Sequence, residues 1–404
     1  MRGVARATFC AALACALASC GEPVPPPAPP PAPGTAPVVP PAARARARAR
    51  DCELVESWPV ETRLDHADIP DAASVWIAMI DGARETLEIA EFYLSDAPPS
   101  ARPSALTKVV AAIQRAAARG VRVRVLVEDA FYAKYPELPD ALAATPGVAL
   151  RRAEGKRLYG GGILHAKYFV VDGRDAYVGS QNFDYRSLEH IHELGLRTRD
   201  ASVVTRLVAT FRRDFRAAGG DAPLPPPLAP EPANAAVHFA ASPRDALPEG
   251  VAWDLPLLEA RLDGARREVL VQALGYKAAM RDGAPFVALD AALRRALARG
   301  VRVTLQVGHW HGKEPSLLAL REAGATVRVL EVPRWSGGDV PFARVIHAKY
   351  MVVDGERAWL GTSNWEGDYF LKSRNVSVFI DDASFAKRLA RVFADVAEAL
   401  PEAR

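Results

Sequence analysis

Net charge, cysteine and long apolar runs are all scarce in this sequence. Its 51 Lys and Arg residues nearly balance 48 Asp and Glu residues over 404 positions, so bulk charge gives no argument for a nucleic-acid partner. Apolar residues make up 50% and charged residues 25%, which excludes a largely disordered chain and a polytopic membrane protein. The length allows two domains, each large enough to bury its own core.

Cysteine is confined almost entirely to the start of the chain. Four cysteines occur, and Cys10, Cys15 and Cys20 all lie near the N-terminus. Only Cys52 remains in the body that follows, so we expect no internal disulfide there, although export would place the protein in an oxidising compartment. We therefore expect packing to supply the stability of the fold.

The N-terminus predicts export. A short apolar run, residues 9–18, follows two arginines and is too short to span a bilayer comfortably, which indicates a signal peptide over residues 1–19. Its end, Leu17-Ala18-Ser19-Cys20, resembles a bacterial lipoprotein cleavage box and implies a diacylglycerol on the Cys20 thiol. An ordinary signal peptide with an incidental cysteine is the alternative. We expect a membrane-anchored lipoprotein of the cell envelope, with the outer membrane or a periplasmic face favoured because Gly21 is not acidic.

A linker over residues 20–51 follows the leader. Eleven prolines between Gly21 and Pro41 predict an extended, semi-rigid spacer that cannot form a core. Alternating alanine and arginine then run to Arg50, where the arginines can contact anionic headgroups or form a merely solvated tail.

The body of the chain is duplicated. Three short sequences recur at almost constant offsets: residues 81–84 at 263–266, residues 118–123 at 298–303, and residues 165–168 at 347–350. We therefore expect two similar halves, residues 52–218 and 234–404. The stretch 219–233, rich in glycine and proline, is the predicted joint between them.

Each half alternates strand and helix patterns, which predicts an α/β fold with sheets flanked by helices. The expected strands are residues 86–93, 121–127, 268–276 and 301–307, and the expected helices are residues 106–118 and 288–298.

Both halves contain the spacing H-x-K-x4-D-x6-G-[ST]-x-N. In the first half a strand over residues 163–171, an Asp-Gly turn and a return strand over residues 176–180 are predicted, with His165 and Lys167 on one face. Ser180 and Asn182 end the return strand. The second copy consists of His347, Lys349, Asp354, Thr362 and Asn364.

Two complete copies indicate one phosphoryl pocket at the interface of the halves, across a pseudo-two-fold axis. The lysines would bind phosphoryl oxygens, while Ser180, Asn182, Thr362 and Asn364 would donate hydrogen bonds. One neutral imidazole can attack phosphorus, and the opposite imidazolium can protonate the leaving oxygen.

The carboxylates of the motif region divide into two roles. Asp172 and Asp354 fit the turn chemistry of their hairpins and are expected to be structural. Glu193 follows His165 by 28 residues and is the expected partner of that imidazole, whereas the equivalent position after His347 is Asn375. This asymmetry predicts His165 as the nucleophile and His347 as the acid.

A metal site is the competing interpretation of the histidines. The neighbouring lysines repel divalent cations and the motif brings no carboxylate cluster, so no metal and no cofactor is predicted.

These residues resemble the phospholipase D superfamily, whose signature is a paired histidine–lysine–aspartate motif. The resemblance extends from about Cys52 to the C-terminus and implies a covalent phosphohistidine, metal-independent cleavage of phosphodiesters, and hydrolysis or transfer to an alcohol. A narrower resemblance, to the branch of vertebrate lysosomal 5′-exonucleases and poxviral envelope phospholipase-like proteins, rests on residues 183–188, 361–365, 368–370, Trp310 with 314–316, and Cys52 with 54–57. The chain departs from that branch in its unpaired Cys52 and its lipoprotein leader.

The substrate is left open between phospholipid and single-stranded nucleic acid. Phe183, Trp335, Phe342, Trp365, Tyr369 and Phe370 lie near the motifs and can stack bases, hold acyl chains or pack in a core. Trp335 and Trp365 are the predicted residues of the substrate mouth. A non-catalytic, phosphate-binding envelope lipoprotein on the same fold is the alternative function.

Overall fold

The computed structural model describes residues 51–225, 227–232 and 235–403. The predicted leader, the linker before Asp51 and the lipidation site Cys20 lie outside these residues. The described residues contain two mixed sheets that repeat one strand order, and the predicted α/β class is thereby confirmed.

Sheet 1 belongs to the first half of the chain and has the order β1-β9-β7-β6-β2-β4-β5. Its strands are β1 (Cys52–Ser57), β2 (Thr86–Glu91), β4 (Arg122–Glu128), β5 (Val148–Ala153), β6 (Tyr168–Val171), β7 (Asp175–Gly179) and β9 (Glu193–Thr198), and the short pair β3 (Leu94–Ser95) and β8 (Phe183–Asp184) lies apart. The helices are α1 (Ala72–Asp81), α2 (Ala105–Ala118), α3 (Asp129–Tyr132), α4 (Glu137–Ala143), α5 (Gly155–Leu158), α6 (Tyr185–Glu189) and α7 (Ala201–Ala217), with a 3-10 turn over Pro99–Ala101.

Sheet 2 repeats this plan in the order β11-β10-β17-β16-β15-β12-β13-β14. Its strands are β10 (Val237–Ser242), β11 (Ala252–Trp253), β12 (Glu268–Ala273), β13 (Arg302–Gly308), β14 (Thr326–Leu330), β15 (Tyr350–Val353), β16 (Arg357–Gly361) and β17 (Asn375–Ile380). The helices are α8 (Asp254–Asp263), α9 (Ala288–Ala298), α10 (Pro315–Glu322), α11 (Gly367–Leu371) and α12 (Ala383–Ala399), with 3-10 turns over Arg244–Ala246 and His309–His311.

Corresponding strands of the two sheets have corresponding neighbours. β2 pairs parallel with β4 and antiparallel with β6, and β12 pairs in the same way with β13 and β15. β2 and β4 are parallel because helix α2 connects them, and α9 connects β12 to β13 in the same way. Parallel neighbours need such a crossover connection.

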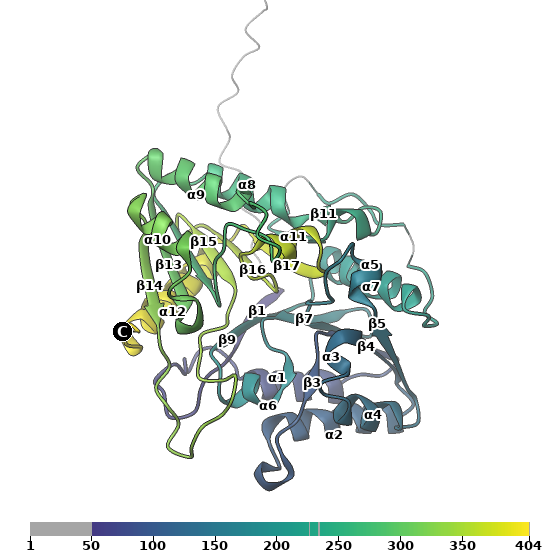
Figure 1. Ribbon diagram of the computed structural model, residues 1–404. Helices are drawn as coiled ribbons and strands as arrows, with labels where there is room; N and C mark the ends of the chain where they lie inside the picture. Colours follow the sequence, from purple (N-terminus) through teal and green to yellow (C-terminus); the bar gives the residue numbers. More distant parts are fainter. Residues whose placement is uncertain (1–50, 226, 233–234, 404) are drawn as a thin grey trace, which may run out of the picture. The chain divides into compact units, whose positions relative to one another are not determined.

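Alternation along the hairpin strands places a core on both faces of each sheet. In β6, Tyr168 and Val170 belong to a central cluster, whereas Phe169 and Val171 belong to an outer cluster under α1 and α2. β15 repeats this pattern with Tyr350 and Val352 in the central cluster. α1 and α2 cover one outer face and α8 and α9 the other (Figure 1).

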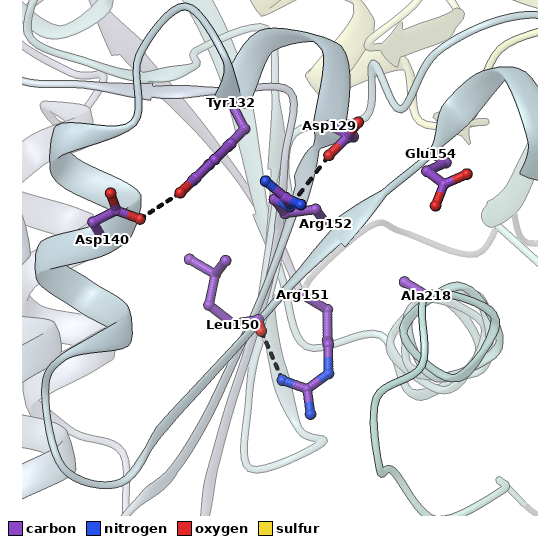
Figure 2. A pocket seen from close by; sticks show the side chains of 8 residues that line it. All are labelled: Asp129, Tyr132, Asp140, Leu150, Arg151, Arg152, Glu154 and Ala218. Atoms are coloured by element: carbon purple, nitrogen blue, oxygen red, sulfur yellow. Dashed lines mark hydrogen bonds and ion pairs between the residues drawn. The ribbon is translucent and has the colours of Figure 1, made fainter.

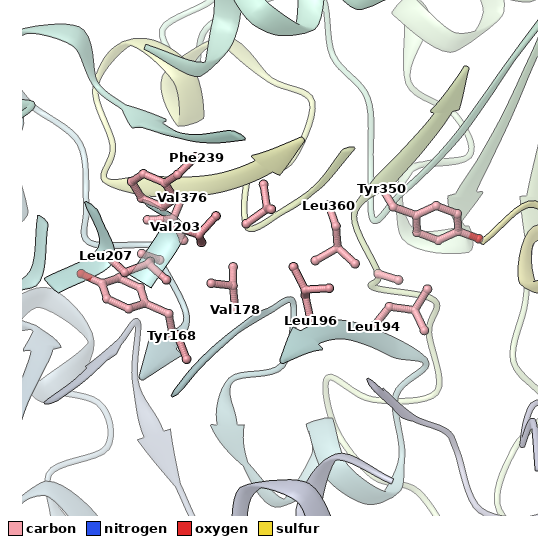
Figure 3. Close-up of a cluster of buried hydrophobic side chains, with 14 of the residues drawn as sticks. Tyr168, Val178, Leu194, Leu196, Val203, Leu207, Phe239, Tyr350, Leu360 and Val376 are labelled. Carbon is pink, nitrogen blue, oxygen red and sulfur yellow. The ribbon is translucent and has the colours of Figure 1, made fainter. Parts of the chain in front are cut away.

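The central cluster joins the halves. It contains Val178 and Leu196 from sheet 1 and Leu360 and Val376 from sheet 2, together with residues of α7 and α12, and its side chains from both sheets face one another (Figure 3). Because this apolar interface is fully buried, it holds the ends of β6 and β15 in one place.

The motif strands begin later than expected. β6 starts at Tyr168, although a strand from residue 163 was predicted, because the backbone of residues 163–165 bonds to Arg374 of the other half. The Asp-Gly turn is confirmed: Val171 pairs with Asp175, and in the loop between them Asp172 and Gly173 have left-handed φ of 51° and 62°.

Among the described residues, no helix has the length and apolar character needed to cross a membrane.

Candidate active site

The first motif is anchored to the second half of the chain. The His165 backbone N–H donates to the carbonyl of Arg374 at 2.9 Å, and the His165 Nδ1 lies 3.0 Å from the Oδ1 of Asn375. The Lys167 ammonium donates to the His165 carbonyl and is fully buried. The first imidazole is therefore oriented by an amide at the start of β17.

The second motif is anchored to the first half in the same way. The His347 backbone N–H donates to the His192 carbonyl at 2.8 Å, and the His347 Nδ1 lies 2.8 Å from the Oε2 of Glu193. The Lys349 ammonium donates to the His347 carbonyl. A buried carboxylate at the start of β9 therefore orients the second imidazole.

The predicted pairing of Glu193 with His165 is wrong. Each motif segment bonds through its backbone to the residue just before the last strand of the opposite half, so the side chains cross between the halves. Spacing along one half cannot reveal this exchange. The Glu193 carboxylate therefore contacts His347, and the Asn375 amide contacts His165. Because His165 was predicted as the nucleophile on the ground that Glu193 would contact it, the structure moves that argument to His347.

The tautomers of both rings follow from these partners. The Asn375 amide nitrogen donates to the Tyr369 carbonyl at 2.7 Å, so the amide oxygen faces His165 and accepts from its Nδ1–H. The carboxylate of Glu193 likewise accepts from the Nδ1–H of His347. In both neutral rings the Nε2 atom is left with a lone pair.

The two motifs form a single electrostatic site. Burial lowers the pKa of His165 well below its usual value, and Lys167 and Lys349 lower it further. Burial, Lys349 and Lys167 act on the pKa of His347 in the same direction. Each imidazole is held by a side chain of the opposite half and each lysine lowers the pKa of both imidazoles, so the four groups belong to one buried site in which the neutral form of both histidines is favoured.

Burial also shifts the charged partners. It lowers the pKa of Lys349 to about 7, with Glu193 opposing the shift. It raises the pKa of Glu193 to about 7, with Lys349 opposing. Glu91 and Glu193 likewise oppose the lowering that burial causes in the pKa of Lys167, so the two buried lysines share the site with two buried carboxylates.

Ser180 and Thr362 have partners within the fold. The Ser180 hydroxyl bonds both the carbonyl and the N–H of Leu194 at 3.2 Å. The Thr362 hydroxyl donates to the Asn375 Oδ1 at 2.9 Å and accepts from the Val376 N–H. Both hydroxyls are fully buried. They were predicted to donate to a phosphate, but in this structure they bond to β9 and β17 and help to position these strands.

Asn182 and Asn364 differ from the hydroxyls. Both side chains are 5% exposed, and neither Oδ1 has a hydrogen-bond partner among the described residues. A buried amide of this kind is available to a ligand.

The motif aspartates lie at the far ends of their hairpins. The Asp172 carboxylate accepts from the backbone N–H groups of Arg84, Glu85 and Thr86. Asp354 does the same for residues 266–268. For both, burial opposes ionisation but the three backbone donors outweigh it and lower the pKa. Each aspartate ties a hairpin turn to the start of the neighbouring strand.

The two predicted mouth residues have different environments. Trp365 is 1% exposed and packs edge-on against Trp359 at 6.1 Å, so its prediction as a mouth residue is wrong. It follows Asn364 on a segment that turns into the core of sheet 2. Trp335 is partly exposed and lies 4.9 Å from the ring of His190, in the connection between β14 and β15.

Three side chains at the site were not assigned a role by motif spacing. Tyr369, noted only among the nearby aromatics, lies edge-on to His165 at 4.6 Å, and Phe92 lies 5.1 Å from the same ring. Glu91 is buried at the end of β2, and Lys167 partly offsets the rise that burial causes in its pKa. The sequence signal for Glu91 is a carboxylate at the end of a largely apolar strand, residues 86–91.

Metal-ligand geometry is not seen in the part of the chain that the structure describes: no three His, Cys, Asp or Glu side chains gather as a metal site would require. Cys52 is a free thiol within that part, and burial raises its pKa to about 12.

Comparison with known proteins identifies the family. Residues 76–215 and 258–397, which together cover more than half of the chain, match the family described as "Cardiolipin synthase, PLD-like domain". The chain belongs to the phospholipase D superfamily. The predicted membership is confirmed, and each matched segment contains one of the two motifs.

The relatives include enzymes of two names. The 5'-3' exonuclease PLD4 of Mus musculus is 32% identical, over 81% of this chain and 72% of the relative. The probable phospholipase D F09G2.8 of Caenorhabditis elegans is 30% identical, over 85% and 69% respectively. Relatives with these names support a phosphodiesterase of the phospholipase D type.

A solved structure supports the fold alone. Phosphatidylserine synthase of Haemophilus influenzae superposes with a TM-score of 0.59 over 89% of this chain and 88% of its own, at 13% identity.

Proposed function

We propose that this protein cleaves phosphodiesters through a covalent phosphohistidine on His347. The observation that supports the proposal is the convergence of two neutral imidazoles and two buried lysines, with the only imidazole–carboxylate contact of the motif pair at His347. A carboxylate on Nδ1–H stabilises the positive charge that develops when Nε2 forms a bond.

In the first step the Nε2 lone pair of His347 forms a bond to phosphorus while the bond from phosphorus to the leaving oxygen breaks. His165, protonated once the anionic substrate offsets the two lysines, gives its Nε2 proton to that oxygen. In the second step a water or alcohol attacks phosphorus, His165 takes its proton, and the N–P bond breaks. Lys167 and Lys349 stabilise the negative oxygens throughout.

The experiment separates the two histidines by leaving group. A p-nitrophenyl phosphodiester has a leaving group that needs little protonation, so His165→Ala should still give a burst of nitrophenol and trap phosphoryl on the protein. His347→Ala should give neither, and His238→Ala, outside the site, serves as the matched control. Label retained on the His347→Ala protein after alkaline denaturation, which leaves a phosphohistidine intact, or a burst from that protein, would contradict the proposal.

The same trapping experiment separates an enzyme from the alternative, a phosphate-binding protein without catalysis. The relatives' names leave two substrate classes in the proposal, phospholipid and nucleic acid. Phosphatidylglycerol vesicles and a 5′-hydroxyl oligonucleotide offered side by side decide between them.

We further propose that the protein is anchored to the cell envelope through a lipid on Cys20. The proposal rests on the Leu17–Cys20 sequence and the proline-rich residues after it. Labelled palmitate should enter the wild-type chain and not Cys20→Ala, and the variant should leave the membrane fraction. Equal labelling of both would refute the anchor.

A further inference from the structure

A row of aromatic rings leads away from His165. Ring centroids are 5.1 Å apart between His165 and Phe92, 4.0 Å between Phe92 and Phe131, 5.7 Å between Phe131 and Tyr93, and 5.2 Å between Tyr93 and Tyr135. We call Phe92, Phe131, Tyr93 and Tyr135 the aromatic row. All four are partly exposed, so the row lines a surface and is not a closed core.

Phe342 of the second half stands at the outer end of the row. Its side chain is 64% exposed, and the Lys134 ammonium lies 4.9 Å from its ring and 5.2 Å from the ring of Tyr135. Lys134 therefore connects Phe342 to the row by cation–π contacts.

The backbone holds Phe342 in this position at a conformational cost. Phe342 and Arg344 have φ of 60° and 56°, a region that bulky side chains rarely adopt. The surrounding contacts fix the segment: the Arg344 guanidinium donates to the carbonyls of Pro333 and Val60, and Arg186 donates to the carbonyl of Pro341. An exposed ring held this firmly is suited to contact with a ligand.

The inner part of the row is held from the other side of α3. Tyr132 donates to Asp140 at 2.6 Å, and Arg152 pairs with Asp129 at 3.2 Å while lying over the Tyr132 ring (Figure 2). These contacts border a hollow of about 400 Å³ that contains no motif residue. They fix α3, and with it the position of Phe131.

Positive charge accompanies the row at both ends. The Lys167 ammonium lies 5.0 Å from the Phe92 ring at the inner end, and the exposed Lys134 ammonium lies 5.2 Å from the Tyr135 ring at the outer end. Alternation of aromatic faces with cations matches single-stranded nucleic acid, whose bases stack on rings and whose phosphates meet Lys and Arg. An acyl chain gains nothing from the Lys134 cation at the outer end.

We propose that the aromatic row and Phe342 bind unpaired bases of a single-stranded nucleic acid whose scissile phosphate lies between His165 and His347. The inference rests on the proposed function for the position of that phosphate. The Tyr93 ring is stacked between those of Phe131 and Tyr135, so the bases next to the phosphate follow the exposed side of the row outward, and Phe342, 64% exposed, offers the open stacking face.

Binding tests the subsite without any need for turnover. In the His347→Ala background, fluorescence anisotropy compares a labelled oligonucleotide with an abasic strand of equal length and charge. Base–aromatic stacking predicts about tenfold weaker binding of the oligonucleotide to Phe342→Ala and little change for the abasic strand. Equal losses for both strands, or no loss, would overturn the proposal; Leu318→Ala, exposed on α10, is the control.

Kinetics distinguishes the two substrate classes. Phe342→Ala should raise KM for the oligonucleotide about tenfold more than for a p-nitrophenyl phosphodiester, as the loss of one stacking contact implies. A loss confined to phosphatidylglycerol vesicles would instead assign the row to acyl chains and overturn the proposal. If the wild-type protein hydrolyses no phosphodiester, the proposed function fails, and the anisotropy measurement still decides the subsite.

Lys134 gives a second, independent measurement. Lys134→Ala should reduce the slope of log affinity against log salt by about one, because one phosphate contact is lost. Lys387→Ala, an exposed lysine on α12, should leave the slope as it is, and an equal slope in both variants would contradict the proposal.

Discussion

Replacing Glu193 by glutamine tests the assignment of His347 as the nucleophile. The Oε2 of Glu193 lies 2.8 Å from the His347 Nδ1, and the carboxylate is fully buried. An amide still accepts from Nδ1–H, so the variant removes the charge and keeps the geometry. Because the side chain has no access to solvent, an ion from solution cannot replace the lost charge.

The magnitude follows from the charged part of this hydrogen bond. Charge-assisted hydrogen bonds exceed neutral ones by about 1–2 kcal/mol, which is a loss of about 5- to 30-fold in the rate of phosphorylation. The loss falls on the step in which His347 gains positive charge.

Stopped-flow release of p-nitrophenol from a phosphodiester measures this step as the burst rate. Glu193→Gln should slow the burst, whereas Glu154→Gln, an exposed carboxylate paired with Arg157, should match the wild type. An unchanged burst in Glu193→Gln together with a slowed burst in Asn375→Ala would place the nucleophile on His165 and refute the reasoning.

Three further predictions concern pH and stability. Burial lowers the pKa of Lys349 to about 7 and raises that of Glu193 to about 7, so kcat/KM of the free enzyme should fall on both sides of about pH 7: below it as Glu193 loses its charge, above it as Lys349 does. Lys349→Arg should flatten the alkaline limb because guanidinium stays charged. Asp354→Asn should lower the free energy of unfolding by about 1–3 kcal/mol at pH 7, measured by urea denaturation, because three backbone donors lose a charged acceptor. Trp365→Ala should cost about 3–5 kcal/mol in the same assay, as expected for a buried aromatic residue.

For each of these three predictions, one outcome would contradict the physical reason given for it. The pKa of Asp354 is lowered in the fold, so its contribution is present above its unfolded pKa and disappears as the pH falls through the folded value. A difference between wild type and Asp354→Asn that persisted in acid would contradict this account. An alkaline limb that Lys349→Arg leaves in place assigns the titration to another group. A Trp365→Ala protein of wild-type stability would contradict its place in the core.

Several elements could be read directly from the local pattern. The helix predicted over residues 288–298 is α9 with the same bounds, and the Asp-Gly turn has the left-handed conformation that its residues favour. Periodicity and turn chemistry depend on neighbours in the chain, so a local reading suffices for them. The predicted strand from residue 163 was wrong because its first residues pair with Arg374, which is distant in sequence.

Duplication of the histidine–lysine motif, and with it the family and the two-sheet plan, was determined by the sequence alone, because motif spacing and apolar alternation are properties of the chain itself. Only the tertiary structure decided the partners. Glu193 orients His347, Asn375 orients His165, and the Ser180 and Thr362 hydroxyls bond within the fold. These contacts join the two halves or lie between buried strands. They depend on how the two sheets pack against each other, and the spacing of residues within one half does not predict that packing.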